Sequence, residues 1–140
     1  MLHNEKSITL SKYRLDMAKE FLESARKNLE IEEYKTANNR AYYSVFHCLR
    51  AVIALDQVDF KKHSGVIAFF REHYIKTGTF DRECSDIISN TELIRHKSDY
   101  DDFYIAKKSD TIEQVESAAI VYDKVSAYLQ QIYADAAQSQ

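Results

Sequence analysis

The chain contains no proline, no tryptophan and only two glycines among its 140 residues. Average proline usage of roughly 5% would place about seven prolines in a chain of this length. Few residues are therefore available to form tight turns or to interrupt helices. No segment shows a strict period-2 alternation bounded by turn residues, so β-strands are not required. The scarcity of turn formers predicts an all-α protein built from long helices.

Cysteine is also scarce. Cys48 and Cys84 are too few for a disulfide framework, and we expect both to be reduced, buried, small apolar residues. The first residues show no cationic stretch followed by an apolar one, and no run approaches the roughly 18 apolar residues of a membrane span. These features predict a cytoplasmic protein with no membrane association.

The formal net charge is −3 and the isoelectric point is near 5.9. This acidic balance argues against a protein that coats nucleic acid electrostatically, so any anion site must be local. The glycine-rich phosphate-binding motifs, the HExxH motif and paired CxxC motifs are absent. The sequence therefore predicts neither a metal nor a cofactor.

Apolar residues recur at steps of three and four along several segments, as in amphipathic helices. The expected helices span about residues 12–31, 34–55, 61–74, 81–97 and 110–134. Ser11 is the expected N-cap of the first helix, Gly78 fits the left-handed stop after the third, and Asp110 with Glu113 resembles a capping box. We expect an up-and-down helical bundle of four to five helices. It would form a single domain over residues 1–140, with a core over about 12–134 and frayed termini.

The second expected helix carries polar residues among many apolar ones. Arg40, Tyr43 and His47 lie at positions i, i+3 and i+7 and share one face. Polar groups on a helix packed on several sides must find partners. We expect structural roles, with Arg40 paired to a core carboxylate and His47 hydrogen-bonded between helices.

Three separated segments carry a resemblance to a known family. They are RAYYSVFH at residues 40–47, KHSGVI at 62–67, and LIR at 93–95 followed by DY at 99–100. In this order they resemble the HEPN family over about residues 12–130. The resemblance implies a helical bundle, frequently a two-fold dimer, that is often paired with a minimal nucleotidyltransferase.

The resemblance also implies a candidate site. Many HEPN proteins are metal-independent ribonucleases whose motif is an arginine, usually followed by a polar residue, and a histidine a few positions later. Arg95 and His96 match, but Tyr100 occupies the place of the spaced histidine, and tyrosine, with a pKa of about 10, is a poor base at neutral pH. His96 is the candidate replacement, oriented by Asp99; alternatively, Arg95 and Asp99 form an ordinary surface ion pair. Arg40 and His47 also fit the motif as a string, but for them a structural role is favoured.

Further residues have two interpretations each. Lys62 and His63 lie at the start of an expected helix and could bind a phosphate, or they could simply be solvated. Lys97 could add to a basic rim beside Arg95, or it too could simply be solvated. Residues 99, 101 and 102 are aspartates that could bind a hard cation but suit a solvated turn better. The tyrosines either stack on bases or fill the core and a dimer interface: Tyr42, Tyr43, Tyr100 and Tyr104.

Two functional classes follow. The first is a nucleotide- or RNA-associated binding module. We expect it to be dimeric, to work with a nucleotidyltransferase-type partner, and to use Arg95, His96 and the segment 100–104, with Asp101 among its binding residues. The second is a metal-independent endoribonuclease of a toxin-antitoxin or defence system with a diverged site at the dimer seam. Tyr100 favours the first class. A helical adaptor without a ligand is a third reading, which only the family resemblance weakens.

Overall fold

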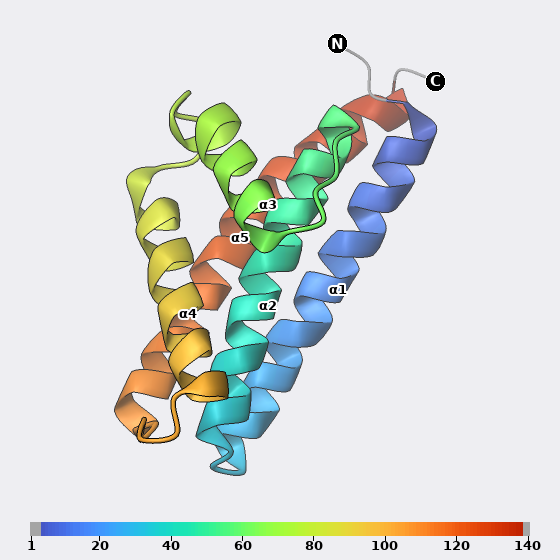
Figure 1. The fold of residues 1–140 in the computed structure, drawn as a ribbon. Coiled ribbons are helices and arrows are strands. Elements are labelled where there is room, and N and C mark those ends of the chain that lie inside the picture. The colour runs from blue at the N-terminus through green and yellow to red at the C-terminus, as the bar shows by residue number, and fades with distance from the viewer. Residues whose placement is uncertain (1–3, 139–140) are drawn as a thin grey trace.

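The computed structural model describes residues 4–138, which form five α-helices, a 3-10 turn and a π-helical turn, with no strand in that range. The elements are α1 (Glu5–Glu30), α2 (Tyr34–Ile53), η1 (Ala54–Asp56), α3 (His63–Phe70), η2 (Arg71–Ile75), α4 (Arg82–Tyr100) and α5 (Lys108–Gln138). The four long helices alternate in direction, and α3 covers one end (Figure 1). The predicted all-α, up-and-down bundle is confirmed. Residues 1–3 and 139–140, at the termini expected to fray, lie outside the described residues.

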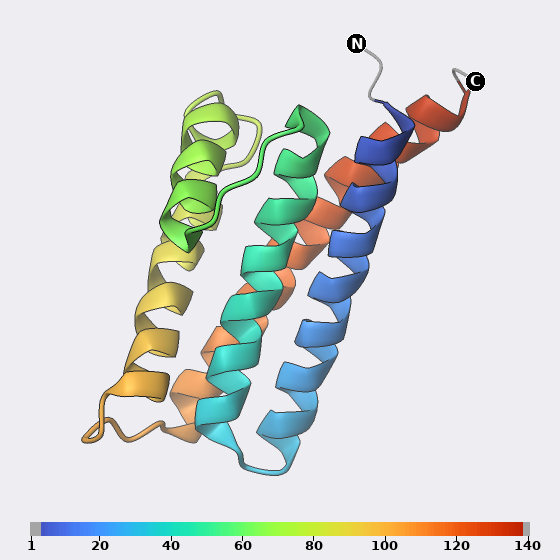
Figure 2. The ribbon, with the colours of Figure 1, turned by 45° about the vertical axis from the view of Figure 1, so that its right-hand side comes forward.

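Helix α2 lies at the centre of the bundle. It packs against α1, α3, α4 and α5, and Figure 2 shows it between α1 and α4 with α5 behind. Buried residues occur on several of its faces, including Ala41, Cys48 and Val52, which are fully buried. Cys84 of α4 is also buried, both thiols are free, and burial raises the pKa of each. The sequence interpretation of two buried, inert cysteines is confirmed.

Helices α1 and α2 are joined by buried serines. The Ser11 hydroxyl of α1 donates to the Ala51 carbonyl at 2.7 Å, and the Ser44 hydroxyl of α2 donates to the Ala18 carbonyl at 2.8 Å. The expected N-cap role of Ser11 is wrong, because α1 begins earlier, at Glu5, and Asn4 caps it by accepting from the Ser7 amide. Buried hydroxyls satisfied by main-chain carbonyls fix the register of the two helices.

Helix α4 continues past the expected break at residue 98, through Tyr100. Within this continued helix, the Ser98 hydroxyl donates to the Ile94 carbonyl at 2.7 Å and accepts from Asn38 of α2 at 3.1 Å. A serine that the sequence assigned to a loop is thus a buried contact between α2 and α4. The last turn of α4, which carries the motif residues, is therefore held firmly against α2.

The remaining helix boundaries differ by a few residues from expectation. Helix α5 begins at Lys108, so Asp110 lies in its first turn and the expected capping box is wrong. It also runs to Gln138, beyond the expected end at residue 134. Gly78 has a φ of 81°, as its predicted left-handed role requires. Within residues 4–138 no helix is both long and apolar enough to cross a membrane.

Candidate functional site

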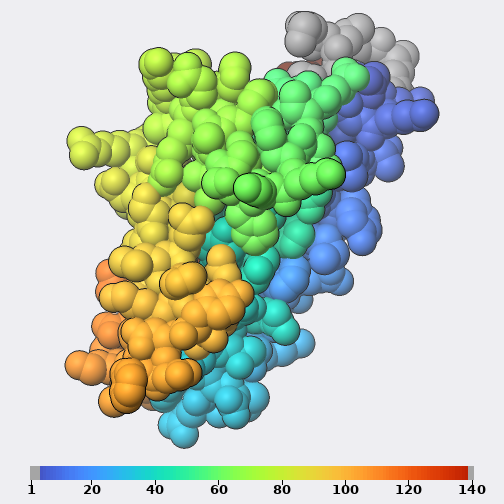
Figure 3. Space-filling model, in the orientation of Figure 1, coloured from blue at the N-terminus to red at the C-terminus, as the bar shows by residue number. Residues whose placement is uncertain are grey.

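The open face of α2 lies between α1 and α4, beneath α3, where Figure 3 shows part of its surface. Aromatic and imidazole rings from three helices gather on and behind this face. We call this group the aromatic cluster: Phe21 of α1, Tyr42, Tyr43, Phe46 and His47 of α2, and His63 of α3. Rings from α1 and α3, which are far apart in the sequence, therefore both contact the rings of α2.

His63 is held by this cluster at the first residue of α3. Its ring stacks on Phe46, with centroids 3.9 Å apart and planes 26° apart. Its Nδ1 lies 2.9 Å from the Tyr42 hydroxyl, and the tautomer decides which of the two atoms donates. One ring nitrogen and one ring face are therefore fixed by α2.

Arg95 of α4 lies on the other side of Tyr42. Its side chain is only 13% exposed, and its guanidinium carbon is 4.7 Å from the Tyr42 ring centroid and 5.8 Å from that of Tyr43. Cation–π attraction compensates part of the desolvation. Nε is buried without a hydrogen-bond partner, and the ion pair to Asp99 is long, at 3.8 Å. Arg95 therefore retains hydrogen-bonding capacity that the described protein atoms do not use.

These residues define one group, contributed by three helices. We call it the Arg95 site: Arg95, Asp99 and Tyr100 of α4, Asn39, Tyr42 and Tyr43 of α2, and His63 of α3. A polar hollow of about 520 Å³ adjoins it and is lined by Lys35, Thr36, Asn39, Arg40, Ser98 and Asp99. Polar side chains thus surround an open space beside the buried guanidinium.

Electrostatics set the protonation states at this site. The pKa of Tyr42 is raised to about 12, mainly by burial and then by the negative charge of Glu92, while the positive charge of Arg95 opposes the shift. Burial and then Arg95 lower the pKa of His63, against the smaller opposing effect of Glu92. At neutral pH Tyr42 keeps its proton and His63 is a neutral imidazole. The arrangement therefore presents a cation and a proton acceptor close together.

His96 is not oriented by Asp99, contrary to the sequence expectation. The Asp99 carboxylate accepts from the Asn39 side chain at 3.0 Å and pairs with Arg95. His96 is exposed and lies against the Tyr100 ring, with centroids 5.0 Å apart. Because the carboxylate is engaged by an arginine and by a residue of α2, it does not fix the exposed imidazole.

The expected partners of Arg40 and His47 are also wrong. Arg40 donates to the Asn39 side-chain oxygen at 3.1 Å and lies 5.6 Å from the Phe21 ring centroid, with no carboxylate partner among residues 4–138. His47 stacks on Phe21, with centroids 5.1 Å apart, and its buried Nδ1 has no hydrogen-bond partner in the described chain. Burial and then the Arg50 cation lower the pKa of His47 to about 4. Its imidazole is neutral at pH 7.

The loop after α4 holds two further sequence candidates. Asp101 accepts from the Phe103 amide at 3.0 Å, as in an Asx turn. Tyr104 bonds through its amide to the Asp101 carbonyl, and its hydroxyl is buried without a partner. Across residues 4–138 no group of three or more His, Cys, Asp or Glu side chains could hold a metal ion. The aspartates at 99, 101 and 102 therefore do not assemble a cation site.

The two lysine candidates lie outside the Arg95 site. Lys62 is the exposed residue before α3, and its side chain makes no cap bond. Lys97 is half-buried on α4, two residues beyond Arg95. Of the sequence candidates, the structure brings Arg95, Tyr43 and His63 together from three helices, with Asp99 and Tyr100 at their edge.

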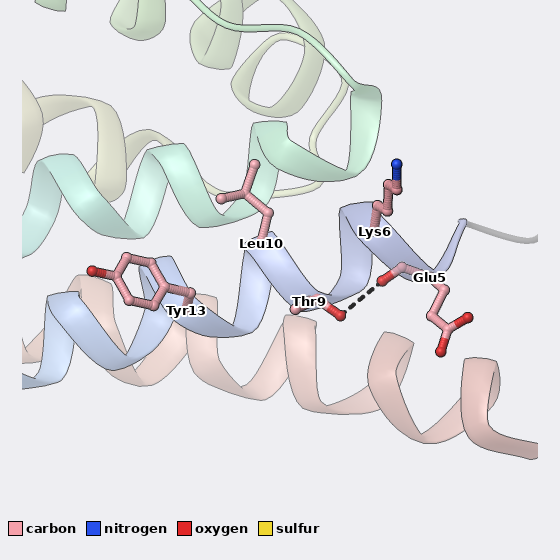
Figure 4. Close-up of a pocket in the computed structure, with 5 residues that line it drawn as sticks. All are labelled: Glu5, Lys6, Thr9, Leu10 and Tyr13. Atoms are coloured by element: carbon pink, nitrogen blue, oxygen red, sulfur yellow. Dashed lines mark hydrogen bonds between the residues drawn. The ribbon is translucent and has the colours of Figure 1, made fainter.

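A second hollow of about 540 Å³ lies on α1, lined by Glu5, Lys6, Thr9, Leu10 and Tyr13 (Figure 4). Its lining comes from one helix, and the hydrogen bond drawn there joins the Thr9 hydroxyl to the Glu5 carbonyl. Leu10 and Tyr13 make it largely apolar. It presents no converging polar groups and is separate from the Arg95 site.

Sequence reasoning missed two members of this surface, Phe21 and Asn39, and the role of Tyr42 as the partner of His63. Phe21 had a usable signal, because it is an aromatic residue next to the apolar stripe of α1 rather than in it. Asn39 had none, since its bond to Asp99 joins residues 60 positions apart.

Fold and site together define a helical-bundle protein with an arginine-centred polar and aromatic surface. The chain belongs to the HEPN domain family, whose model matches residues 11–128. It is 32% identical over 125 residues to a Methanocaldococcus jannaschii protein named "putative toxin", covering 84% of each chain. It is 26% identical over 129 residues to a Thermotoga maritima protein named UPF0332 protein, covering 92% of this chain and 97% of that one.

The half-buried imidazole of His47, whose Nδ1 has no hydrogen-bond partner within residues 4–138, makes stability depend on pH. Its pKa is about 4 in the folded chain, below the ordinary value of 6.5, so the unfolded chain binds more protons between these values and stability falls as pH falls. Between about pH 6.5 and about pH 4.5, the unfolding free energy of wild type should fall by about 2 kcal/mol more than that of His47→Gln. Urea unfolding at several pH values measures this. His73→Gln, on an exposed residue, is the control, and equal slopes for wild type and His47→Gln would contradict the prediction.

Proposed function

We propose that this HEPN protein is an RNA- or nucleotide-binding module whose contact surface is the Arg95 site. The observation that carries the proposal is the nearly buried guanidinium over Tyr42 and Tyr43, whose Nε has no partner. Arginine binds phosphate oxygens through charge-assisted hydrogen bonds. Tyr100, 67% exposed beside it, offers a ring on which a base can stack. Local binding of this kind is compatible with the net negative charge.

We further propose a homodimer formed through the end of α4 and the loop that follows it. Large apolar side chains are exposed there, with Phe103 at 94%: Leu93, Tyr100, Phe103 and Ile105. Contiguous exposed apolar surface is typical of interaction sites. Because Tyr100 belongs to both the patch and the Arg95 site, two copies joined here would bring their Arg95 sites to one seam.

The family resemblance supports two further parts of the proposal. A nucleotidyltransferase-type protein is the proposed partner, and its co-elution with this chain from a mixture of the two purified proteins would support the pairing, whereas separate elution would oppose it. The cytoplasm is the proposed location, because RNA is present there. Neither part rests on a particular contact in the structure.

The second candidate function is a metal-independent endoribonuclease, and the placement of His63 favours it. When His63 Nδ1–H donates to the Tyr42 oxygen, the Nε2 lone pair is free to take the proton of a ribose 2′-hydroxyl. The 2′-oxygen then bonds to the adjacent phosphorus, the bond from phosphorus to the 5′-oxygen breaks, and that oxygen takes a proton from water. Arg95 would stabilise the extra charge on the phosphorane. Two relatives named "putative toxin" are compatible with this activity.

Removing the Arg95 cation should weaken RNA binding. Arg95→Gln is expected to raise the Kd for a labelled single-stranded RNA about tenfold, because a charge-assisted hydrogen bond contributes about 1.5 kcal/mol. Fluorescence anisotropy in EDTA measures the change. Lys124→Gln is the charge-matched control, since Lys124 is held by Asp81 and Glu83 near the start of α4. Equal affinity of wild type and a folded Arg95→Gln variant would refute the binding site.

Cleavage should depend on His63 rather than His96 if the second function holds. Wild type incubated in EDTA with a tRNA mixture is expected to leave 2′,3′-cyclic phosphate ends, and His63→Gln should lower the rate at least about a hundredfold, the usual contribution of a general base. His96→Ala should retain most activity. Loss of activity in His96→Ala with retention in His63→Gln would reverse the assignment, and binding without cleavage by wild type would leave the module as a binder.

The exposed patch predicts the oligomeric state. Light scattering at micromolar concentration should report about twice the 16.3 kDa chain mass. Phe103→Asp should shift the protein to monomer, because it places a charge in the proposed apolar interface. Tyr13→Asp, at an exposed aromatic residue of α1, is the matched control and should remain dimeric. A wild-type monomer would remove the seam.

A further inference from the structure

Arg14 of α1 is a charged residue in an almost fully buried position. Its side chain is only 7% exposed. Nη1 donates to the Arg50 main-chain carbonyl at 3.1 Å, near the end of α2, and Nη2 lies 3.6 Å from an Asp59 oxygen. A guanidinium has five N–H donors, and this contact to Arg50 is the one hydrogen bond that Arg14 makes within residues 4–138. Most of its donors therefore have no protein acceptor among these residues.

The positive charge around Arg14 is not balanced. The Arg50 guanidinium approaches the same Asp59 carboxylate at 3.7 Å, so two cations share one anion. Both separations exceed the 2.7–2.9 Å of a charge-assisted hydrogen bond, and the Asp59 side chain is 62% exposed. Burial and the neighbouring Arg50 lower the pKa of Arg14, and Asp59 opposes this only as the smallest of the three effects. The nearby His47 ring is neutral, since burial and then the charges of Arg50 and Arg14 lower its pKa, and it adds no further positive charge.

Arg14 and Asp59 also line a hollow of about 320 Å³ between the start of α1 and the segment after η1. The lining residues are Asn4, Lys6, Ser7, Leu10, Arg14, Ala54, Gln57, Val58 and Asp59. Lys6 adds a third cation, and Asp59 is the only carboxylate of this lining. Asp56, the other acid of the segment, accepts from the Tyr74 hydroxyl instead. Among the described lining residues, Lys6 and Arg14 against Asp59 leave a formal charge of plus one. Arg50 is not part of the lining but approaches Asp59 at 3.7 Å, and it raises this charge to plus two.

We propose that this hollow is a binding site for a phosphate group, held by Arg14 and Arg50, with Asp59 as an internal carboxylate that competes for the same guanidiniums. A surplus of two positive charges matches a phosphate dianion better than a single carboxylate. The hollow is larger than a phosphate, so the ligand is a molecule that carries the group. The inference goes beyond the proposed function, because it concerns a different place on the molecule.

Titration with inorganic phosphate at constant ionic strength tests the site. The melting temperature of wild type should rise with phosphate relative to chloride, because a ligand of the folded state stabilises it. Asp59→Asn should show the same rise at about fivefold lower phosphate, the size expected when one partly exposed ion pair is removed. Arg50→Gln should require at least about tenfold more phosphate. Lys124→Gln is the matched control and should respond like wild type, because Lys124 is paired with Asp81 and Glu83 and belongs to neither proposed site.

A purely structural role of Arg14 predicts a different result. If Arg14 serves only as a clamp between α1 and α2, Asp59→Asn will lower the melting temperature and neither it nor wild type will respond to phosphate beyond chloride. A second measurement avoids variants altogether. In a ¹⁵N-correlated spectrum of wild type, phosphate should shift the Ser7 and Gln57 amides, which line this hollow, whether or not the amides around Arg95 also shift. Shifts confined to the Arg95 region would refute the site and assign phosphate to the proposed function instead.

RNA-binding measurements distinguish whether the bound phosphate group belongs to an RNA strand or to a small molecule. If the group belongs to an RNA strand, Arg50→Gln will weaken RNA binding and reduce the salt dependence of log Kd by about one phosphate contact. If it belongs to a small molecule, RNA binding will be unchanged in Arg50→Gln while the phosphate titration still shifts. Failure of Arg95→Gln to weaken RNA binding would remove the proposed function and leave this site standing.

Discussion

The burial of α2 on several sides constrains the rest of the structure. Four other helices pack against it, so every polar group on it must be bonded to another helix or lie on the one face left open. Ser44 satisfies the first condition through the Ala18 carbonyl. Tyr43 and His47 lie half-buried on the open face. The candidate site is therefore placed where the central helix is least covered.

Aromatic rings on that face allow cations to be buried without an equal number of carboxylates. Arg95 lies over Tyr42 and Tyr43, and Arg40 lies over Phe21. Ring faces attract cations but use none of their hydrogen bonds. A guanidinium stabilised in this way keeps N–H donors for a ligand. In a guanidinium paired with a bidentate carboxylate, those donors would already be hydrogen-bonded. This property links the packing of the bundle to its proposed affinity for phosphates.

Tyr100 occupies the place of the motif histidine, and a histidine from another helix lies close to Arg95 in the structure. In the sequence, His96 is the histidine nearest to the place of the missing motif histidine. Its ring is exposed, however, and Asp99 does not orient it. His63 is 32 positions before Arg95, but it shares Tyr42 with it and is neutral at pH 7. In the proposed ribonuclease, His63 would take the role of the motif histidine, because the fold brings it and Arg95 to the same tyrosine. Arg14 of α1 and Arg50 near the end of α2 form a second cationic position.

The sequence alone determined the all-α class, the approximate places of the helices, the burial of both cysteines and the left-handed role of Gly78, because helical periodicity and backbone freedom are local properties. It placed Ser11, Ser98 and Asp110 wrongly, because whether a short polar residue caps a helix or bonds across a core depends on what packs against it. Tertiary structure alone decided four longer-range contacts: those of Arg40 and His47 with the Phe21 ring, that of His63 with Tyr42, and that of Asn39 with Asp99. Each of these contacts joins groups whose separation along the chain or burial is set by the packing of α2, which no local pattern records.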